Sequence, residues 1–168
     1  SKRMLTAHRD GFYTNGMDQD KHHPRLLRST RQALPIALLK AREAVMGHFR
    51  PMLAQYNVTE QQWRVLRLLS ERGQIDATEL AQGAALLAPS LTRMIKALED
   101  RNLIKTTRDA SDGRRVLVAI DDPGVKLLDE VRPESIKIYE DLEQRIGRDK
   151  IEALVALLNE VTDKATSK

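Results

Sequence analysis

A short segment in the middle of the chain combines hydroxyl-bearing and basic side chains at helical spacing. We expect a helix over residues 89–101, because apolar residues recur there every three or four positions. The inward side of this helix then carries Leu91, Met94, Ile95 and Leu98. The outward side carries Ser90, Thr92, Arg93, Lys96 and Asp100. Hydroxyls and cations of this kind bind phosphates and base edges, so the segment could read a nucleic acid.

A second group of basic residues surrounds a turn-rich stretch at residues 109–114. Residues 103–108 and 115–120 have the apolar and β-branched composition of strands, so the stretch between them is the tip of a β-hairpin. The tip and its stems carry Arg108, Asp112, Arg114 and Arg115. An arginine at such a tip can enter the minor groove of DNA, where the potential is most negative. The alternative is ordinary turn chemistry, since Asp-Gly is common in hairpins.

The elements before and between these groups match a winged helix-turn-helix. The stretch Asp76–Glu79 has the pattern of a capping box and opens a short helix at residues 77–84. A four-residue turn follows, and Pro89 suits the first position of the next helix. The major groove of B-DNA is about 12 Å wide and admits one helix, which must bury one face and offer the other. A plain helical bundle is the alternative for the helix pair alone, and the hairpin argues against it.

Two helices are expected ahead of the helix-turn-helix. Apolar residues recur every three or four positions over residues 33–56, although Pro51 should kink or interrupt that helix because proline has no backbone N–H. Thr59 and Gln62 have the spacing of a capping box. The helix that follows, residues 60–72, is apolar on most sides, so we expect it to lie in the core.

After the hairpin, a long helix should begin at Asp121 or Asp122 and carry one apolar stripe. Pro133 is expected to kink or split this helix, and Gly147 to end it. A last helix begins near Asp149. The stripes of the terminal helices have no obvious partner within so short a chain, which indicates pairing with a second copy. The alternative is that the terminal helices pack on each other.

The composition excludes several classes of protein. The 168 residues are 41% hydrophobic and include no cysteine, which allows a real core and removes disulfides, thiolate metal sites and cysteine redox chemistry. No apolar run approaches the ~20 residues that span a bilayer, and the first residues are polar, so a cytoplasmic protein without a membrane partner is expected. The net charge of residues 88–115 is +3 and that of residues 122–168 is −3, which favours a local surface for a polyanion.

These stretches also resemble a known family. Residues 79–124 are similar to the MarR family of bacterial regulators, above all in the run from Ser90 to Ile104. The matching residues of the wing are Asp109, Asp112, Arg114, Arg115 and Gly124. Residues 36–69 resemble the branch that controls the degradation of homoprotocatechuate, an aromatic acid. The resemblance covers residues 34–165.

The chain departs from the family pattern at three places. Asn102 stands where the family usually has glycine, and asparagine tolerates the same left-handed conformation. Ile120-Asp121 stands where the family usually has Leu-Thr, and aspartate caps a helix as threonine does. Residues 1–30 lie outside the pattern, and we expect an arm of unknown role there.

The resemblance implies a homodimer that binds a pseudo-palindromic operator, as a repressor that a small aromatic carboxylate or phenol releases from DNA. Residues 31–56 and 124–165 would form a helical dimerisation region, and residues 57–123 the DNA-binding region. The fold class expected is therefore mainly α with a small β-hairpin wing. The residues expected to contact DNA are Ser90, Leu91, Thr92, Arg93, Lys96, Arg108, Asp112, Arg114 and Arg115.

The expected ligand pocket lies on the first two helices. Its candidate residues are Arg42, Met46, His48, Phe49, Trp63 and Arg67, with Arg64 nearby. A cation beside apolar and aromatic side chains suits an aromatic carboxylate, because a desolvated anion needs a paired cation. The alternative is that Arg42 and Arg67 pair with Glu43, Glu60 or acids of the last helices. For His48 the alternative is an ordinary helix histidine without a ligand.

We expect no enzyme, because the chain has no cysteine nucleophile, no glycine-rich phosphate loop and no histidine paired with a plausible acid in a motif. His8, His22 and His23 lie on the arm in poor geometry for a metal, so neither a metal nor a cofactor is expected. Two other functions remain open, a winged-helix regulator without a small-molecule ligand and a winged-helix module that binds protein. Arg93 and Arg114 argue against the second.

Overall fold

The computed structural model describes residue 29 and residues 32–167. These belong to two units, residues 1–41 and residues 42–168. In the first unit, the structure describes the beginning of one helix, and the arm with its three histidines lies almost entirely outside the described residues. The second unit holds every other helix and strand that the structure describes.

The helix α1 runs from Leu34 to Gln55 without a break. Pro51 lies inside it, so the interruption that the sequence allowed does not occur. A proline removes one helical hydrogen bond. Here Phe49, Met52 and Leu53 on either side are buried, and their packing holds the two turns in one helix.

Three helices form the predicted helix-turn-helix and the buried helix before it: α2 (Glu60–Arg72), α3 (Ala77–Gly83) and α4 (Ala88–Asp100). At α2 the capping box is confirmed, because Thr59 Oγ1 accepts from the N–H of Gln62 and the Gln62 side chain accepts from the N–H of Thr59, both at 3.1 Å. At α3 only half of the predicted box is present: Asp76 Oδ1 accepts from the N–H of Glu79 at 2.8 Å.

The strands β1 (Ile75–Asp76), β2 (Ile104–Arg108) and β3 (Val116–Ile120) form one antiparallel sheet in the order β1-β3-β2. The predicted hairpin is β2–β3, with Ile104 opposite Ile120. β1 was not predicted, because a strand of two residues is too short to show alternating apolar and polar side chains. In the structure, Ile75 of β1 pairs with Val118 of β3. Asn102 has a φ of 56°, which confirms the left-handed turn expected between α4 and the hairpin.

The chain ends in α5 (Asp122–Ile146) and α6 (Arg148–Thr166). Asp121 is the N-cap of α5, and its side chain accepts from the N–H of Asp122 at 3.0 Å; the helix is not split at Pro133. Gly147, with a φ of 101°, separates the two helices as predicted. Buried residues lie along α5 on both sides of Pro133, including Val131 and Leu142, so packing again carries the helix through a proline.

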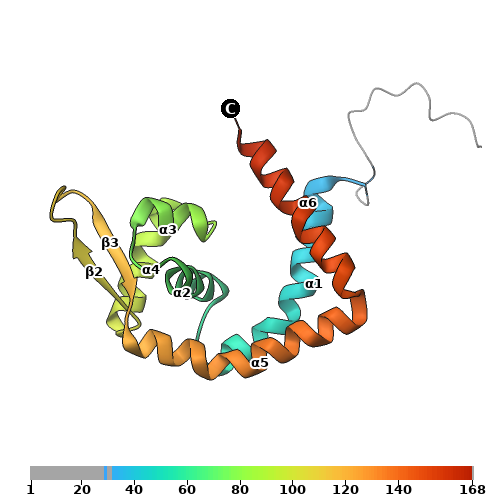
Figure 1. Ribbon diagram of the computed structural model, residues 1–168, viewed down its shortest axis with the longest axis horizontal. Coiled ribbons are helices and arrows are strands. Elements are labelled where there is room, and N and C mark those ends of the chain that lie inside the picture. The colour runs from blue at the N-terminus through green and yellow to red at the C-terminus, as the bar shows by residue number, and fades with distance from the viewer. Residues whose placement is uncertain (1–28, 30–31, 168) are drawn as a thin grey trace, which may run out of the picture. The chain divides into compact units, whose positions relative to one another are not determined.

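Two apolar clusters form the core of the second unit. The larger one joins α2, α3, α4 and the sheet, and the hairpin β2–β3 extends beyond these helices (Figure 1). The smaller one joins α1 and α5 around Met52 and Val131. Trp63 of α2 packs against both clusters. The arrangement of helices, turn and hairpin is the predicted winged helix-turn-helix, and Trp63 stands where its core meets the long helices.

Candidate nucleic-acid interface and ligand cavity

α4 presents one face to the core and the other to solvent, as the sequence predicted. Met94 and Leu98 are buried. The exposed side chains of this helix include Ser90, Thr92, Arg93 and Lys96. Leu91 was expected among the DNA contacts, but it is only 4% exposed, so its side chain cannot reach a partner and it leaves that set.

The cations of α4 and of the β2–β3 hairpin differ in whether carboxylates of the protein neutralise them. Within the part of the chain that the structure describes, Arg93, Lys96 and Arg114 form no ion pair with a carboxylate. Arg108 donates only to the backbone oxygen of Gly113, at 3.3 Å. These four charges are therefore available to an anionic partner.

The side chains of Asp109 and Asp112 order the turn at the wing tip through hydrogen bonds. Asp112 Oδ1 accepts from the backbone N–H of Arg114 at 3.1 Å, so this carboxylate orders the turn and leaves the Arg114 guanidinium exposed. Asp109 Oδ1 accepts from both the backbone N–H and the hydroxyl of Ser111, at 2.8 and 2.7 Å. These bonds lower the pKa of the Asp109 carboxyl, the hydroxyl contributing most.

Arg115, another expected DNA contact, has a different role in the structure. Its guanidinium pairs with Asp76 Oδ2 and lies 3.8 Å from Asp109 Oδ2. Asp76 also caps α3, so a single carboxylate joins the start of the helix-turn-helix to the base of the wing. The N–H of Glu79 and then Arg115 lower the pKa of the Asp76 carboxyl, while Asp76 raises the pKa of Arg115. Arg115 thus positions the wing.

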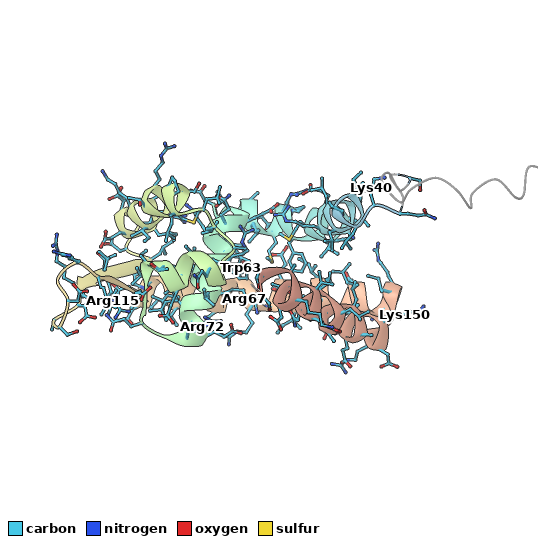
Figure 2. The ribbon with its side chains drawn as sticks, turned by 90° about the horizontal axis from the view of Figure 1, so that it is seen from above. Lys40, Trp63, Arg67, Arg72, Arg115 and Lys150 are labelled. Carbon is cyan, nitrogen blue, oxygen red and sulfur yellow. The ribbon has the colours of Figure 1, made fainter. Side chains whose placement is uncertain are left out.

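A cavity of about 400 Å³ opens between α1, α2 and α5. It brings together five of the six predicted ligand residues. Its walls include Arg42, Met46, Phe49, Glu60, Trp63, Arg64, Arg67 and Tyr139. Figure 2 shows Trp63 and Arg67 close together on α2, well apart from Arg115 at the hairpin. His48 is exposed and does not line the cavity, which favours the ordinary helix histidine.

The cations of the cavity are not equivalent. Arg42 pairs with Glu43 at 2.7 Å and with Glu60, which is the alternative left open for this residue. Arg50 binds the same two carboxylates, at 2.7 and 2.6 Å. The hydrogen bond from Arg50 is the main reason why the pKa of Glu60 is lowered. This four-residue network balances two cations with two anions, so Arg42 has little free charge for a ligand.

Arg64 and Arg67 carry charge that no carboxylate of the described residues balances. Arg64 donates to the backbone oxygen of Ala84 at 2.8 Å, and burial lowers its pKa. Arg67 reaches only the Tyr139 hydroxyl, at 3.5 Å. The alternative pairing with acids is therefore not seen for Arg67, which is the cation best placed for an anionic ligand.

Sequence reasoning missed Tyr139 on α5. Its ring meets Phe49 edge to face with the ring centres 5.0 Å apart, and its hydroxyl faces Arg67. The signal was an aromatic residue within an acidic stretch of a helix. A neighbouring cavity, also of about 400 Å³, shares Trp63, Arg67 and Tyr139 and reaches Ser135, a buried polar residue of α5 that was also missed.

α6 has no buried residue in the second unit, although it is amphipathic. Leu154, Val155, Leu157 and Val161 are all at least 39% exposed. In the described residues no group of three or more histidine, aspartate and glutamate side chains could hold a metal ion. No helix among those residues is both long and apolar enough to cross a membrane.

Comparisons with known proteins identify a family and a fold for this chain. The model of the MarR family matches residues 58–116. The HTH-type transcriptional regulator FarR of Neisseria gonorrhoeae is 41% identical to this chain, over 79% of this chain and 91% of its own length. The homoprotocatechuate degradative operon repressor of Escherichia coli is 35% identical, over 76% of this chain and 86% of its own length.

Two solved structures are similar over most of the chain. The crystal structure of NadR in complex with 4-hydroxyphenylacetate has a TM-score of 0.72 and 40% identity, covering 80% of this chain and 96% of NadR. The transcriptional repressor CouR bound to a 23-mer DNA duplex has a TM-score of 0.70 and 31% identity, covering 77% of this chain and 92% of CouR.

Proposed function

The chain belongs to the MarR family of transcriptional regulators, which are not enzymes, and we propose that it is a repressor that binds a pseudo-palindromic operator as a homodimer and releases it when an aromatic or phenolic acid binds. One observation supports DNA binding above all: exposed Arg93 and Lys96 on α4 and Arg114 at the wing have no acidic partner among the described residues. Unpaired cations bind the phosphates of duplex DNA, and a single helix such as α4 fits the major groove.

Within this proposal, the outward side chains of α4 enter the major groove and Arg108 and Arg114 meet the minor groove or the phosphates. Asp112 and Arg115 also hold the wing in place, and both are exposed, so they stay among the proposed DNA contacts. Residues 57–123 are the proposed DNA-binding region. CouR, a similar protein, is seen on a DNA duplex, which supports this use of the fold.

The proposed dimerisation region is residues 31–56 and 124–165. Its support is the apolar stripe of α6 around Leu154, Leu157 and Val161, which stays exposed in the part of the chain that the structure describes. A second copy would cover this stripe and place the two α4 helices of the dimer about one DNA turn apart, ~34 Å. Two symmetry-related helices bind two symmetry-related half-sites, which is why a pseudo-palindromic operator is expected.

The proposed effector is an aromatic or phenolic acid bound in the cavity at Trp63. NadR is solved with 4-hydroxyphenylacetate, and the Escherichia coli relative is named for homoprotocatechuate degradation. In this chain the carboxylate would pair with Arg67 and the ring would lie against Met46, Phe49 and Trp63. Trp63 packs on both core clusters, so a ligand there can favour one arrangement of the DNA-binding region over another.

DNA binding is tested by fluorescence anisotropy of the full chain with upstream promoter duplexes over a range of salt concentrations. We expect affinity to fall steeply with salt. Arg93→Gln should weaken binding, whereas Lys137→Gln, which removes an exposed cation of α5, serves as the matched control and should not. Binding that is absent at low salt would remove the DNA-binding proposal and favour the protein-interaction module.

The effector site is tested with Arg67→Gln against Arg42→Gln. Trp63 is the only tryptophan, so its fluorescence reports binding of 4-hydroxyphenylacetate, homoprotocatechuate and salicylate. A charge-assisted hydrogen bond contributes about 1.5–3 kcal/mol, so Arg67→Gln should weaken the bound acid about 10- to 150-fold. Arg42→Gln should change the affinity far less, because Arg42 is already neutralised. If no acid changes the fluorescence or the DNA affinity, the regulator without a ligand is favoured.

A further inference from the structure

One apolar side chain beside α4 is largely exposed to solvent. Leu87 directly precedes α4 and is 77% exposed, the largest exposed fraction among the exposed large hydrophobic residues that the structure describes. Its neighbour Leu86, in contrast, is half-buried and packs against the larger core cluster. The exposure of Leu87 is therefore not a property of the whole turn.

The backbone of the turn aims Leu87 outward. Ala85 has a φ of 52°, a left-handed conformation that residues with a side chain rarely adopt. The N–H of Leu86 then donates to the oxygen of Ala81 at 2.8 Å. Leu87 is extended, with φ −78° and ψ 140°. Successive side chains of extended backbone point to opposite sides, so Leu86 faces the core and Leu87 faces solvent.

Leu87 also stands at a position where leucine is a poor choice. It is the N-cap of α4 and makes no capping hydrogen bond with its side chain. Thr59, Asp76 and Asp121 cap α2, α3 and α5 with their side chains. Leucine is among the worst N-cap residues. A local rule that is broken at one exposed position indicates a functional constraint there.

We propose that Leu87 reads the 5-methyl group of a thymine in the operator and so contributes to sequence preference. The inference rests on the proposed function, in which α4 enters the major groove. The N-terminal residues of a recognition helix contact base edges there, and Leu87 directly precedes α4, whose first two turns carry exposed Ser90 and Arg93. An alkyl side chain can neither donate nor accept a hydrogen bond, and the thymine methyl is the apolar group that the major groove displays.

The experiment replaces single thymines of a duplex that binds the full chain with deoxyuridine, which lacks only the methyl group. From the transfer free energy of one buried methyl-sized group, we expect about fourfold weaker binding at one thymine of each half-site. Replacing both symmetry-related thymines should weaken binding about fifteenfold. All other thymines of the duplex serve as internal controls and should show no such loss.

Leu87→Ser separates an effect on thymine recognition from an effect on stability, because it should raise the stability of the fold while it removes the discrimination between thymine and deoxyuridine. A serine can cap α4, so the melting temperature should rise by about 2–4 °C. The same variant should bind the thymine and deoxyuridine duplexes equally. Leu87→Met, which keeps an alkyl side chain, should retain part of the discrimination.

Two outcomes would overturn the proposal. One is wild-type protein that ignores every thymine replacement. The other is full discrimination in Leu87→Ser; if that variant also binds both duplexes more weakly by the same factor, Leu87 has only a general positioning role. If the wild-type chain binds no duplex at all, the proposed function itself fails, and that result is distinct from these two.

Discussion

The close approach of α5 to the base of the wing can be tested at Gly124. A Cβ at this position would lie 2.2 Å from the backbone oxygen of Leu103 and 2.8 Å from Cγ1 of Ile120. The Leu103 oxygen also accepts from the N–H of Asp121, at 3.0 Å, so it is held by the start of the same helix. Gly124→Ala must therefore push α5 away from the turn that connects α4 to the hairpin.

The size of the effect follows from this geometry. Ordinary van der Waals contact begins near 3.4 Å, so the Cβ at Gly124 is about 1 Å too close to a backbone atom that has little freedom to move. Overpacking typically costs 1–3 kcal/mol, and we expect the upper end, about 3 kcal/mol. For a chain of this length that corresponds to a melting temperature about 6–12 °C lower.

Gly47→Ala is the matched control, because Gly47 also lies within a helix but has nothing within 4 Å of a built Cβ. Replacing an unhindered helical glycine with alanine should stabilise the fold by about 0.5–1 kcal/mol. Both variants are measured by thermal and urea unfolding, followed by circular dichroism. Gly124→Ala with unchanged or raised stability would refute the close packing of α5 on Leu103, and with it the fixed base of the wing.

Three further predictions concern the DNA-binding region and the dimer. Arg114→Ala should weaken operator binding and reduce the slope of log K against log salt by about 0.9, measured by anisotropy. Asp76→Asn should keep the α3 cap but lose the ion pair with Arg115, and so weaken DNA binding. Because the pKa of Asp76 is lowered in the folded state, its ionised form stabilises the fold above about pH 4. The difference in stability between the variant and the wild type should therefore disappear as the pH falls further. Leu157→Glu should give a monomer in sedimentation at micromolar concentration, and a dimer there would contradict the role of α6.

Most elements of the fold could be predicted because their signals are local. Apolar periodicity indicated the helices, and side chains within a few residues set their ends: Thr59 begins α2, Asn102 turns left-handed after α4, and Gly147 ends α5. The errors arose where distant packing outweighs a local preference. α1 and α5 continue through their prolines because buried residues flank each one, and β1 exists only because β3 lies beside it.

The sequence by itself determined which residue types the site has: an amphipathic α4 with Arg93 and Lys96 outward, a hairpin tip with Arg114, and arginines near Trp63. These follow from spacing along one element, which the sequence states directly. Only the tertiary structure decided which charges are free.

Arg42 pairs with Glu60, 18 positions away in the sequence, and Arg115 pairs with Asp76, 39 positions away. Among the described residues, Arg67 meets only a tyrosine hydroxyl. The energy of an ion pair depends on the distance between the charges in space, not along the chain. The sequence therefore indicated six arginines of similar promise for DNA or ligand, and the fold separated those that form ion pairs within the protein from those that remain available to a partner.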